Sequence, residues 1–258
     1  MSKTALITGA SSGIGYELAK CFARDGTNLV LLARDEVKLG QIAAELRSPS
    51  VSVKVIAADL ARPVAPSEIL DATRAANIGV DYLVNNAGFG LGGSFAESDL
   101  RTELDMMQVN MVALVHLTRL YLPGMRQRGM GGVLNVASTA AFQPGPLMAI
   151  YYATKAFVLS FTEAIAEELR DTGITATALC PGPTATDFQR RAKIERVRLV
   201  RSKIGVMSAR QVAEIGYRGF LEGKVIVIPG LLNKIGAQSV RISPRAVVRK
   251  VARKLQEG

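Results

Sequence analysis

The sequence predicts an α/β fold: a doubly wound, seven-stranded parallel sheet with helices on both faces. Short apolar runs alternate with helical patterns along the whole chain. Most of these runs lack polar alternation, as expected for parallel strands that are covered on both faces. The 258 residues suit one α/β domain of ordinary size, and no linker or repeat divides them. We therefore expect a single domain over residues 1–258.

The expected elements follow one another in a regular order. Because strands alternate with helices, right-handed crossovers are expected to wind the chain around the sheet. The strand-like runs are residues 5–8, 29–33, 51–57, 80–85, 132–137, 175–180 and 224–228. The helical patterns are residues 14–25, 36–47, 66–77, 99–128, 149–171 and 208–222.

Two segments depart from this alternation. Residues 187–203 follow a Pro-Gly-Pro turn and contain seven basic residues, so we expect a mobile basic flap over a ligand. Residues 230–258 form a basic C-terminal extension, in which 245–256 is predicted to be an amphipathic helix. Such a helix most often docks on its own domain; a second subunit or a membrane surface are the alternatives. Its apolar stripe is Val247, Val248, Val251 and Leu255, and its basic face is Arg249, Lys250, Arg253 and Lys254.

The positive charge is concentrated at the C-terminal end. Residues 1–189 contain 15 Lys/Arg and 18 Asp/Glu, a net charge of −3, whereas residues 190–258 contain 17 and 4, a net charge of +13. Such a face suits an acidic protein, an anionic membrane surface or a phosphorylated substrate, and a solvated surface is the plain alternative. The basic segments lack interleaved aromatic residues, so a nucleic-acid partner is not expected.

Cysteine usage and hydropathy indicate a cytoplasmic protein. Cys21 and Cys180 lie in no Cys/His cluster, so neither a disulfide framework nor a metal site is expected. No apolar run approaches the ~20 residues of a membrane-spanning helix. The first strand follows Met1-Ser2-Lys3 so closely that no signal peptide is expected.

A glycine-rich loop joins the first strand to the first helix. Its sequence is Thr8-Gly9-Ala10-Ser11-Ser12-Gly13-Ile14-Gly15. Backbone N–H groups and the positive end of a helix dipole meet there, which suits a pyrophosphate. We expect Gly9 to allow the tight turn, Gly13 to admit a ligand, and Gly15 to permit close helix–strand packing. No Gly-Lys-Ser/Thr follows, so the loop is not that of an NTP-hydrolysing protein.

A second group of candidate residues lies in the middle of the chain. Ser138 ends a strand-like run, and the carboxyl ends of parallel strands are where ligands bind. Tyr151 and Lys155 are four residues apart on a helical pattern and share one face, whereas Tyr152 lies off that face. An ammonium about 5 Å from a phenol lowers the phenol's pKa by roughly two units, from about 10 towards 8. We therefore expect Tyr151 to act as an acid/base.

With these motifs in order, residues 3 to about 190 resemble the short-chain dehydrogenase/reductase family. The glycine loop matches the family's cofactor loop, and Ser138, Tyr151 and Lys155 match its catalytic set. Asn110 matches the asparagine that anchors a water in the proton relay. The resemblance implies a Rossmann-type fold and a nicotinamide cofactor. The cofactor residues it implies are Gly9, Ser11, Ser12, Gly13, Ile14, Gly15, Asp59, Leu60, Asn86, Ala87, Gly88, Tyr151, Lys155, Pro181, Gly182, Thr184 and Thr186.

The resemblance also implies a mechanism that needs no metal. A hydride moves between the nicotinamide and a carbonyl carbon, Ser138 binds the substrate oxygen, and Tyr151 gives or takes the proton. Lys155 lowers the pKa of Tyr151 and binds the nicotinamide ribose, and Asn110 sustains a water chain. The single histidine, His116, lies inside a predicted helix and is expected to have no catalytic part.

The end of the second strand points to NADP(H) rather than NAD(H). A carboxylate that would bind the ribose 2′-hydroxyl of NAD is absent, since Ala33 occupies that position. Arg34 follows and can pair with a 2′-phosphate, a contact that corresponds to a preference of roughly 10–150-fold. Asp35 is expected to cap the next helix.

The expected substrate is a hydrophobic ketone, aldehyde or secondary alcohol, because the predicted pocket wall is mostly apolar. The alternatives are a 3-oxoacyl group on an acidic carrier protein, a non-catalytic NADP(H) sensor and a peripheral membrane enzyme. We expect a homodimer through residues 99–128 and 149–171. The basic extension puts the family's usual tetramer in doubt, and we expect it either to cover the sheet edge or to seal the substrate pocket. The predicted wall residues are Phe89, Phe142, Gln143, Pro144, Leu147, Met148 and Phe188.

Overall fold

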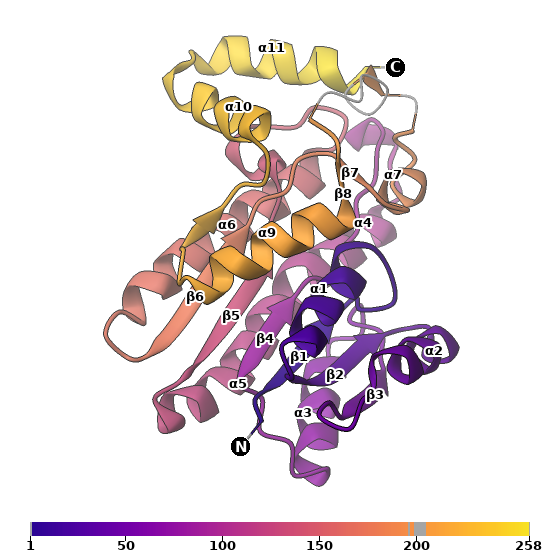
Figure 1. Ribbon diagram of the computed structural model, residues 1–258. Helices are drawn as coiled ribbons and strands as arrows, with labels where there is room; N and C mark the ends of the chain where they lie inside the picture. The colour runs from indigo at the N-terminus through magenta and orange to yellow at the C-terminus, as the bar shows by residue number, and fades with distance from the viewer. Residues whose placement is uncertain (1, 196, 199–204, 258) are drawn as a thin grey trace.

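One parallel sheet runs through the centre of the protein (Figure 1). The computed structural model describes residues 2–195, 197–198 and 205–257. The strand order is β3-β2-β1-β4-β5-β6-β9, and every adjacent pair is parallel, which confirms the predicted doubly wound, seven-stranded sheet. The strands are β1 (Thr4–Thr8), β2 (Asn28–Ala33), β3 (Val53–Ala57), β4 (Tyr82–Asn85), β5 (Gly131–Val136), β6 (Ile174–Leu179) and β9 (Ile226–Val227).

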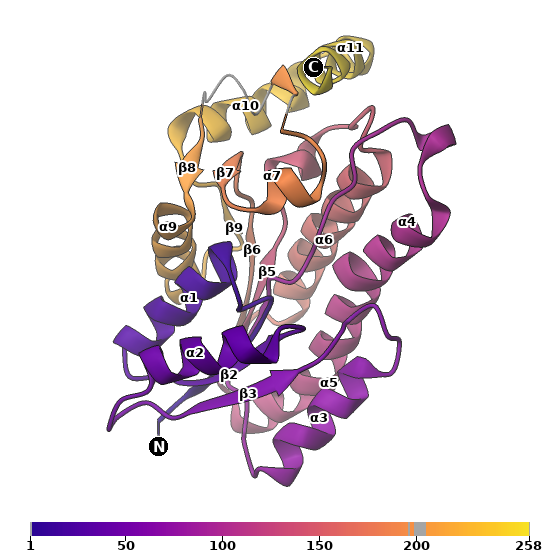
Figure 2. The same cartoon turned by 90° about the vertical axis from the view of Figure 1, so that its right-hand side faces the viewer.

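Helices cover both faces of this sheet (Figures 1 and 2). Neighbouring residues of β1 show why, since Ile7 packs into one core cluster and Leu6 into the other. The first cluster lies under α1 (Gly13–Arg24), α2 (Glu36–Leu46) and α9 (Ala209–Leu221). The second lies under α3 (Ala65–Ala75), α5 (Ala113–Arg128) and α6 (Ala149–Glu168).

The helix expected over residues 99–128 is interrupted. It consists of α4 (Leu100–Met107), a π-helical turn over Gln108–Val112, and α5. The Ala113 N–H donates to the Gln108 carbonyl, five residues back. The apolar spacing could not reveal this wide turn, because the register on both sides remains helical. Such turns are frequent at functional sites, and this one contains Asn110.

The C-terminal extension forms two helices, α10 (Leu231–Ile242) and α11 (Arg245–Gln256). The predicted helix over 245–256 is confirmed, whereas α10 was not expected. The predicted flap over 187–203 begins with α7 (Phe188–Arg191), and its residues 196 and 199–203 lie outside the described residues. A small parallel pair, β7 (Thr184–Ala185) and β8 (Met207–Ser208), was also missed. No helix within the described ranges is long and apolar enough to cross a membrane.

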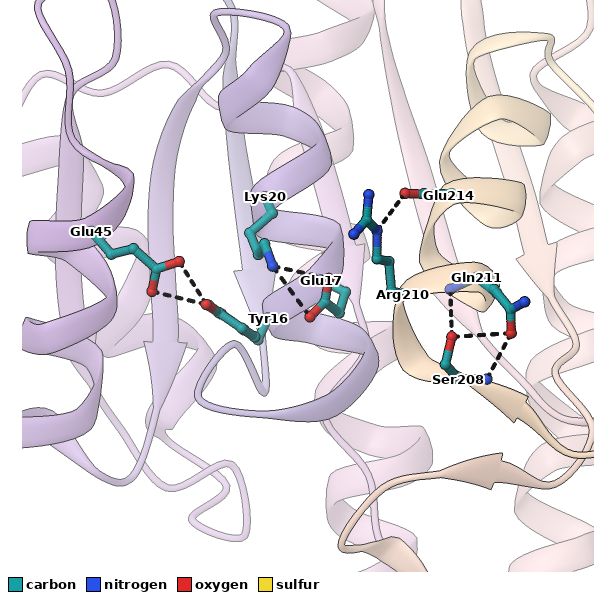
Figure 3. Close-up of polar contacts among 8 residues, drawn as sticks. All are labelled: Tyr16, Glu17, Lys20, Glu45, Ser208, Arg210, Gln211 and Glu214. Carbon is teal, nitrogen blue, oxygen red and sulfur yellow. Dashed lines mark hydrogen bonds and ion pairs between the residues drawn. The ribbon is translucent and has the colours of Figure 1, made fainter.

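Polar contacts fix the helices beside the glycine loop (Figure 3). The Tyr16 hydroxyl contacts both carboxylate oxygens of Glu45, at 2.7 and 2.8 Å, and so joins α1 to α2. This hydrogen bond raises the pKa of Tyr16 to about 12. Ser208 and Gln211 form a capping box that begins α9. The first turn of α1 is therefore fastened to the last turn of α2, and the start of α9 is fixed by its own capping box.

Candidate active site

A cavity of about 1120 Å³ lies at the carboxyl ends of the sheet strands and extends beneath α10 and α11. It is larger than the roughly 300–1,000 Å³ usual for one small ligand. Of the predicted cofactor and catalytic residues, only Gly15 and Asn110 do not line it. The predicted cofactor and catalytic residues that line it are Gly9, Ser11, Ser12, Gly13, Ile14, Arg34, Asp59, Leu60, Asn86, Ala87, Gly88, Ser138, Tyr151, Lys155, Pro181, Gly182, Thr184 and Thr186.

The glycines of the first loop have distinct structural roles. Gly9 and Gly13 have φ values of +65° and +59°, a region that favours glycine. A Cβ on Gly15 would lie 2.4 Å from Asn86 Nδ2 and 2.5 Å from the Gly9 carbonyl oxygen. Gly15 therefore lies behind the cavity wall, where it lets α1 pack closely against the loop.

Hydrogen bonds join this loop to the end of β4. The Thr8 hydroxyl accepts from the N–H groups of Asn86 and Ala87, both at 2.9 Å. The Asn86 side chain donates to the Thr8 carbonyl at 2.8 Å and to the Gly9 carbonyl at 3.2 Å. These hydrogen bonds hold the ends of β1 and β4 in a fixed arrangement at the base of the cavity.

The first turn of α1 leaves its N–H groups available to a ligand. Its N-cap residue, Ser12, makes no side-chain capping hydrogen bond. In contrast, the Asp35 side chain caps α2 by accepting from the Lys38 N–H at 3.0 Å, as expected from the sequence. Uncapped N–H groups at a glycine loop suit phosphate oxygens. The loop therefore fits the pyrophosphate of a dinucleotide.

The predicted catalytic residues meet at the ends of β5 and α6. Tyr151 and Lys155 are both buried on α6, one turn apart. The Lys155 ammonium lies 5.9 Å from the centre of the Tyr151 ring and donates to the Val136 carbonyl at 2.7 Å. Ser138 follows β5 and contacts the Tyr151 phenol. These three side chains form one compact polar group.

The electrostatics differ from those expected. Burial raises the pKa of Tyr151, and the hydrogen bond from Ser138 opposes this rise. Burial also lowers the pKa of Lys155 to about 8. The predicted fall of the Tyr151 pKa towards 8 is therefore wrong for the protein alone, because loss of solvation outweighs the effect of the distant ammonium. A neutral phenol at physiological pH is ready to donate a proton.

Asn110 lies behind this group rather than in the cavity. Its side chain accepts from the Phe89 N–H at 3.1 Å and donates to the Phe89 carbonyl at 3.0 Å. It also donates to the Thr154 hydroxyl at 3.1 Å, and that hydroxyl donates to the Tyr151 carbonyl at 2.7 Å. Asn110 thus joins the loop after β4 to the catalytic helix.

Comparison with known proteins accounts for this arrangement. The family model for the short chain dehydrogenase matches residues 3–196. The chain belongs to the short-chain dehydrogenase/reductase family. It is therefore an oxidoreductase that acts on a carbonyl or hydroxyl group with a nicotinamide cofactor. The match ends before α10 and α11, so these helices lie outside the part that the family model covers.

Individual relatives of this chain support the assignment to the family. A short-chain dehydrogenase from Sphingobium yanoikuyae, solved in complex with NADPH, is 36% identical with a TM-score of 0.81, over 94% of this chain and 96% of that one. The bulky-bulky ketone specific alcohol dehydrogenase from Comamonas testosteroni is 32% identical with a TM-score of 0.77, over 94% and 95%. A putative ketoacyl reductase of Streptomyces coelicolor is 40% identical over 184 residues, 70% of each chain.

The predicted substrate wall is only partly correct. Four of the predicted residues line the cavity, whereas Phe142, Pro144 and Leu147 do not. Phe142 packs instead against the core cluster that contains Val158. Residues of the C-terminal helices supply the rest of the wall, which agrees with one of the two positions expected for the basic extension, although the sequence did not identify the residues that do so. The confirmed wall residues are Phe89, Gln143, Met148 and Phe188, and the added ones are Leu232, Val247, Val251 and Leu255.

Tyr152 also lines the cavity, contrary to the expectation from its position on the helix. Its hydroxyl accepts a hydrogen bond from Gln256 Nε2 at 2.6 Å, and the Gln256 side chain is buried. This contact fastens the end of α11 to the catalytic helix. The prediction missed it because the two residues are 104 positions apart.

The opposite end of the cavity carries exposed positive charge. Arg34 lines it directly after β2, as predicted, and forms no ion pair with any described residue. Lys38 lies in the first turn of α2 and also lines it; the sequence analysis missed this residue, because Arg34 precedes the helix and no helical spacing links the two. Both cations line the same cavity as the glycine loop and the uncapped N-terminus of α1.

Proposed function

We propose that the protein is an NADP(H)-dependent oxidoreductase of bulky, apolar ketones, aldehydes or secondary alcohols. One observation carries this proposal. A single cavity is lined by the glycine-rich loop, by Ser138 and Tyr151, and by apolar residues of α11. The relative that is specific for bulky-bulky ketones, which is similar over most of its length, supports a chamber of this kind.

The residues of this chain suggest their roles in the reaction. When bound, the cofactor supplies or accepts the hydride. The Ser138 hydroxyl would donate to the substrate oxygen, and the neutral Tyr151 phenol would deliver the proton to it. Lys155, held by the Val136 carbonyl, lies near Gly88 and would hold the nicotinamide ribose. Asn110 would act as a positioning residue, because it joins the loop at Phe89 to the catalytic helix.

The preference for NADP(H) rests on Arg34 and Lys38. Position 33 holds an uncharged alanine, whereas an NAD-selecting site would place a carboxylate there. Two exposed cations at this end of the cavity suit a 2′-phosphate. Each contact of this kind contributes about 1.5–3 kcal/mol.

The test compares NADPH with NADH on a series of ketones of increasing apolar size. We expect faster turnover with NADPH and a kcat/KM that rises with apolar size. Replacing Arg34 and Lys38 by Ala should lower kcat/KM with NADPH by roughly 10-fold or more and leave the value with NADH unchanged. Equal use of the two cofactors by the unaltered protein would refute the NADP(H) preference. Tight NADPH binding without turnover would favour a sensor.

A second candidate is reduction of a 3-oxoacyl group on an acidic carrier protein. The putative ketoacyl reductase of Streptomyces coelicolor and the +13 charge of residues 190–258 favour it. Added salt screens charge attraction between two proteins. If a carrier is the partner, salt should weaken turnover of the carrier-bound substrate and spare turnover of a small ketone.

We also propose a homodimer through the helices of residues 99–128 and 149–171. Val112 and Phe157 are exposed large apolar side chains on these helices. Phe157 stacks on Phe161 with a ring separation of 5.9 Å and an interplanar angle of 5°. A flat aromatic pair of this kind suits an isologous interface.

A further inference from the structure

An apolar stripe on the outside of α10 has no partner in the described part of the chain. Leu231, Ile235 and Ile242 are 73%, 56% and 87% exposed. Their spacings of four and seven residues place them on one face of the helix. Neither they nor their neighbours Lys234 and Arg241 line the cavity. The stripe is therefore an outer surface rather than a part of the active site.

Basic side chains lie along one side of this stripe and on the neighbouring helix. Lys234 and Arg241 are exposed on α10, and residues 230–257 contain seven basic residues and one acidic residue, a net charge of +6. On α11, Arg249 and Lys250 are exposed and form no ion pair with any residue that the structure describes. Apolar side chains flanked by Lys and Arg characterise a helix that lies in the plane of an anionic bilayer surface.

The two C-terminal helices present different side chains outward and inward. Figures 1 and 2 show α10 and α11 together at one end of the molecule, away from the N-terminus. Leu232 and Val240 of α10, and Val247 and Val251 of α11, line the cavity. The outer stripe and the cavity wall therefore belong to the same pair of helices.

We propose that α10 and α11 bind the surface of an anionic lipid bilayer, with Leu231, Ile235 and Ile242 inserted among the lipids. Charge argues against a second copy of the chain at this position, because a symmetric contact would bring two surfaces of +6 together. An acidic protein would pair with the basic side chains, but its acidic surface would not bury the apolar side chains of the stripe. If the proposed apolar substrate is correct, it would reach the cavity directly from the membrane.

The test is sedimentation of the full chain with vesicles of phosphatidylcholine alone or mixed with phosphatidylglycerol. We expect binding only to the anionic vesicles. Replacing Ile235 and Ile242 by Gln should weaken it about 10-fold or more. Replacing Arg249 and Lys250 by Gln should weaken it about fivefold for each lost charge. The matched control is Val37→Gln, an exposed apolar residue on α2, which should bind as the unaltered protein does.

Three outcomes would overturn the proposal. The protein would fail to sediment with anionic vesicles, or the Ile235/Ile242 variant would bind them unchanged. Alternatively, light scattering would show that this variant has lost a subunit while vesicle binding persists, which would make the stripe an interface between copies. Because sedimentation does not depend on turnover, these failures are distinct from a failure of the proposed enzymatic function.

Discussion

Two glycine-to-alanine substitutions in helices test how the cofactor loop is built. Gly15 is in the first turn of α1, and a Cβ there would lie 2.4 Å from Asn86 Nδ2 and 2.5 Å from the Gly9 carbonyl oxygen. Gly40 is an exposed residue in the middle of α2, where an added Cβ would meet no atom within 4 Å. The substitutions are chemically identical, so only their surroundings separate their effects.

The two substitutions should change the free energy of unfolding in opposite directions. Gly15→Ala should cost about 1–3 kcal/mol in overpacking and about 1 kcal/mol from the Asn86 hydrogen bond, against a gain of up to about 1 kcal/mol in helix propensity. The net loss of about 1–3 kcal/mol corresponds to a fall in melting temperature of roughly 3–9 °C. Gly40→Ala should gain about 0.5–1 kcal/mol and raise the melting temperature by roughly 1–4 °C.

Thermal unfolding and NADPH binding by fluorescence titration provide the assay. Since the glycine loop must move to accept the Gly15 methyl group, and this loop is proposed to hold the cofactor phosphates, Gly15→Ala should also raise the Kd for NADPH about 10-fold or more, a change of about 1.4 kcal/mol. Gly40→Ala should leave this Kd unchanged. Normal NADPH affinity and normal melting of Gly15→Ala would refute the argument from the Gly9–Asn86 contact.

Three further predictions concern other parts of the molecule. Lys155→Met should abolish turnover yet stabilise the fold near pH 7 by about 2 kcal/mol. Burial of the charged ammonium, which lowers its pKa from 10.5 to about 8, destabilises the wild type by roughly 3 kcal/mol, and loss of its hydrogen bond costs the variant about 1 kcal/mol. The unfolded chain binds the proton of the Lys155 ammonium more tightly than the folded chain, so the wild type regains stability as pH rises from 8 to 10.5. Chemical denaturation should therefore show the difference in free energy of unfolding between variant and wild type shrinking over this pH range. A difference that does not depend on pH would contradict this. Gln256→Leu should raise KM for a bulky ketone about fivefold without changing the Kd for NADPH. If the effects of Gln256→Leu and Tyr152→Phe on KM add up in the double variant, the two side chains are not coupled. Phe157→Glu should convert a dimer to a monomer in light scattering, whereas Leu221→Glu on α9 should not, and equal masses for all three proteins would exclude the proposed interface.

The strands and the cofactor loop could be predicted because their signals are local. Residues 5–7 are apolar, and the loop that follows them has glycines at positions 9, 13 and 15. The roles of Gly9 and Gly15 follow from that spacing and agree with the geometry. Seven strand-like runs separated by helical patterns were enough to predict the sheet.

The walls of the active site could not be predicted in the same way. Residues 231–242 begin after Pro229-Gly230 without a capping side chain and expose much of their apolar surface, so they lack the usual signals of a packed helix. The contact of Gln256 with Tyr152 depends on how α11 folds back over the sheet. The pKa of Tyr151 depends on burial, which its spacing from Lys155 does not reveal.

The most direct test of the central claim compares the wild type with Tyr151→Phe. The measurement is NADPH oxidation in the presence of a bulky apolar ketone, with the Kd for NADPH determined on the same samples. The account predicts turnover by the wild type, a loss of about 10²–10⁴-fold in Tyr151→Phe, and an unchanged Kd. Equal turnover by the two proteins would contradict the assignment of Tyr151 as the proton donor.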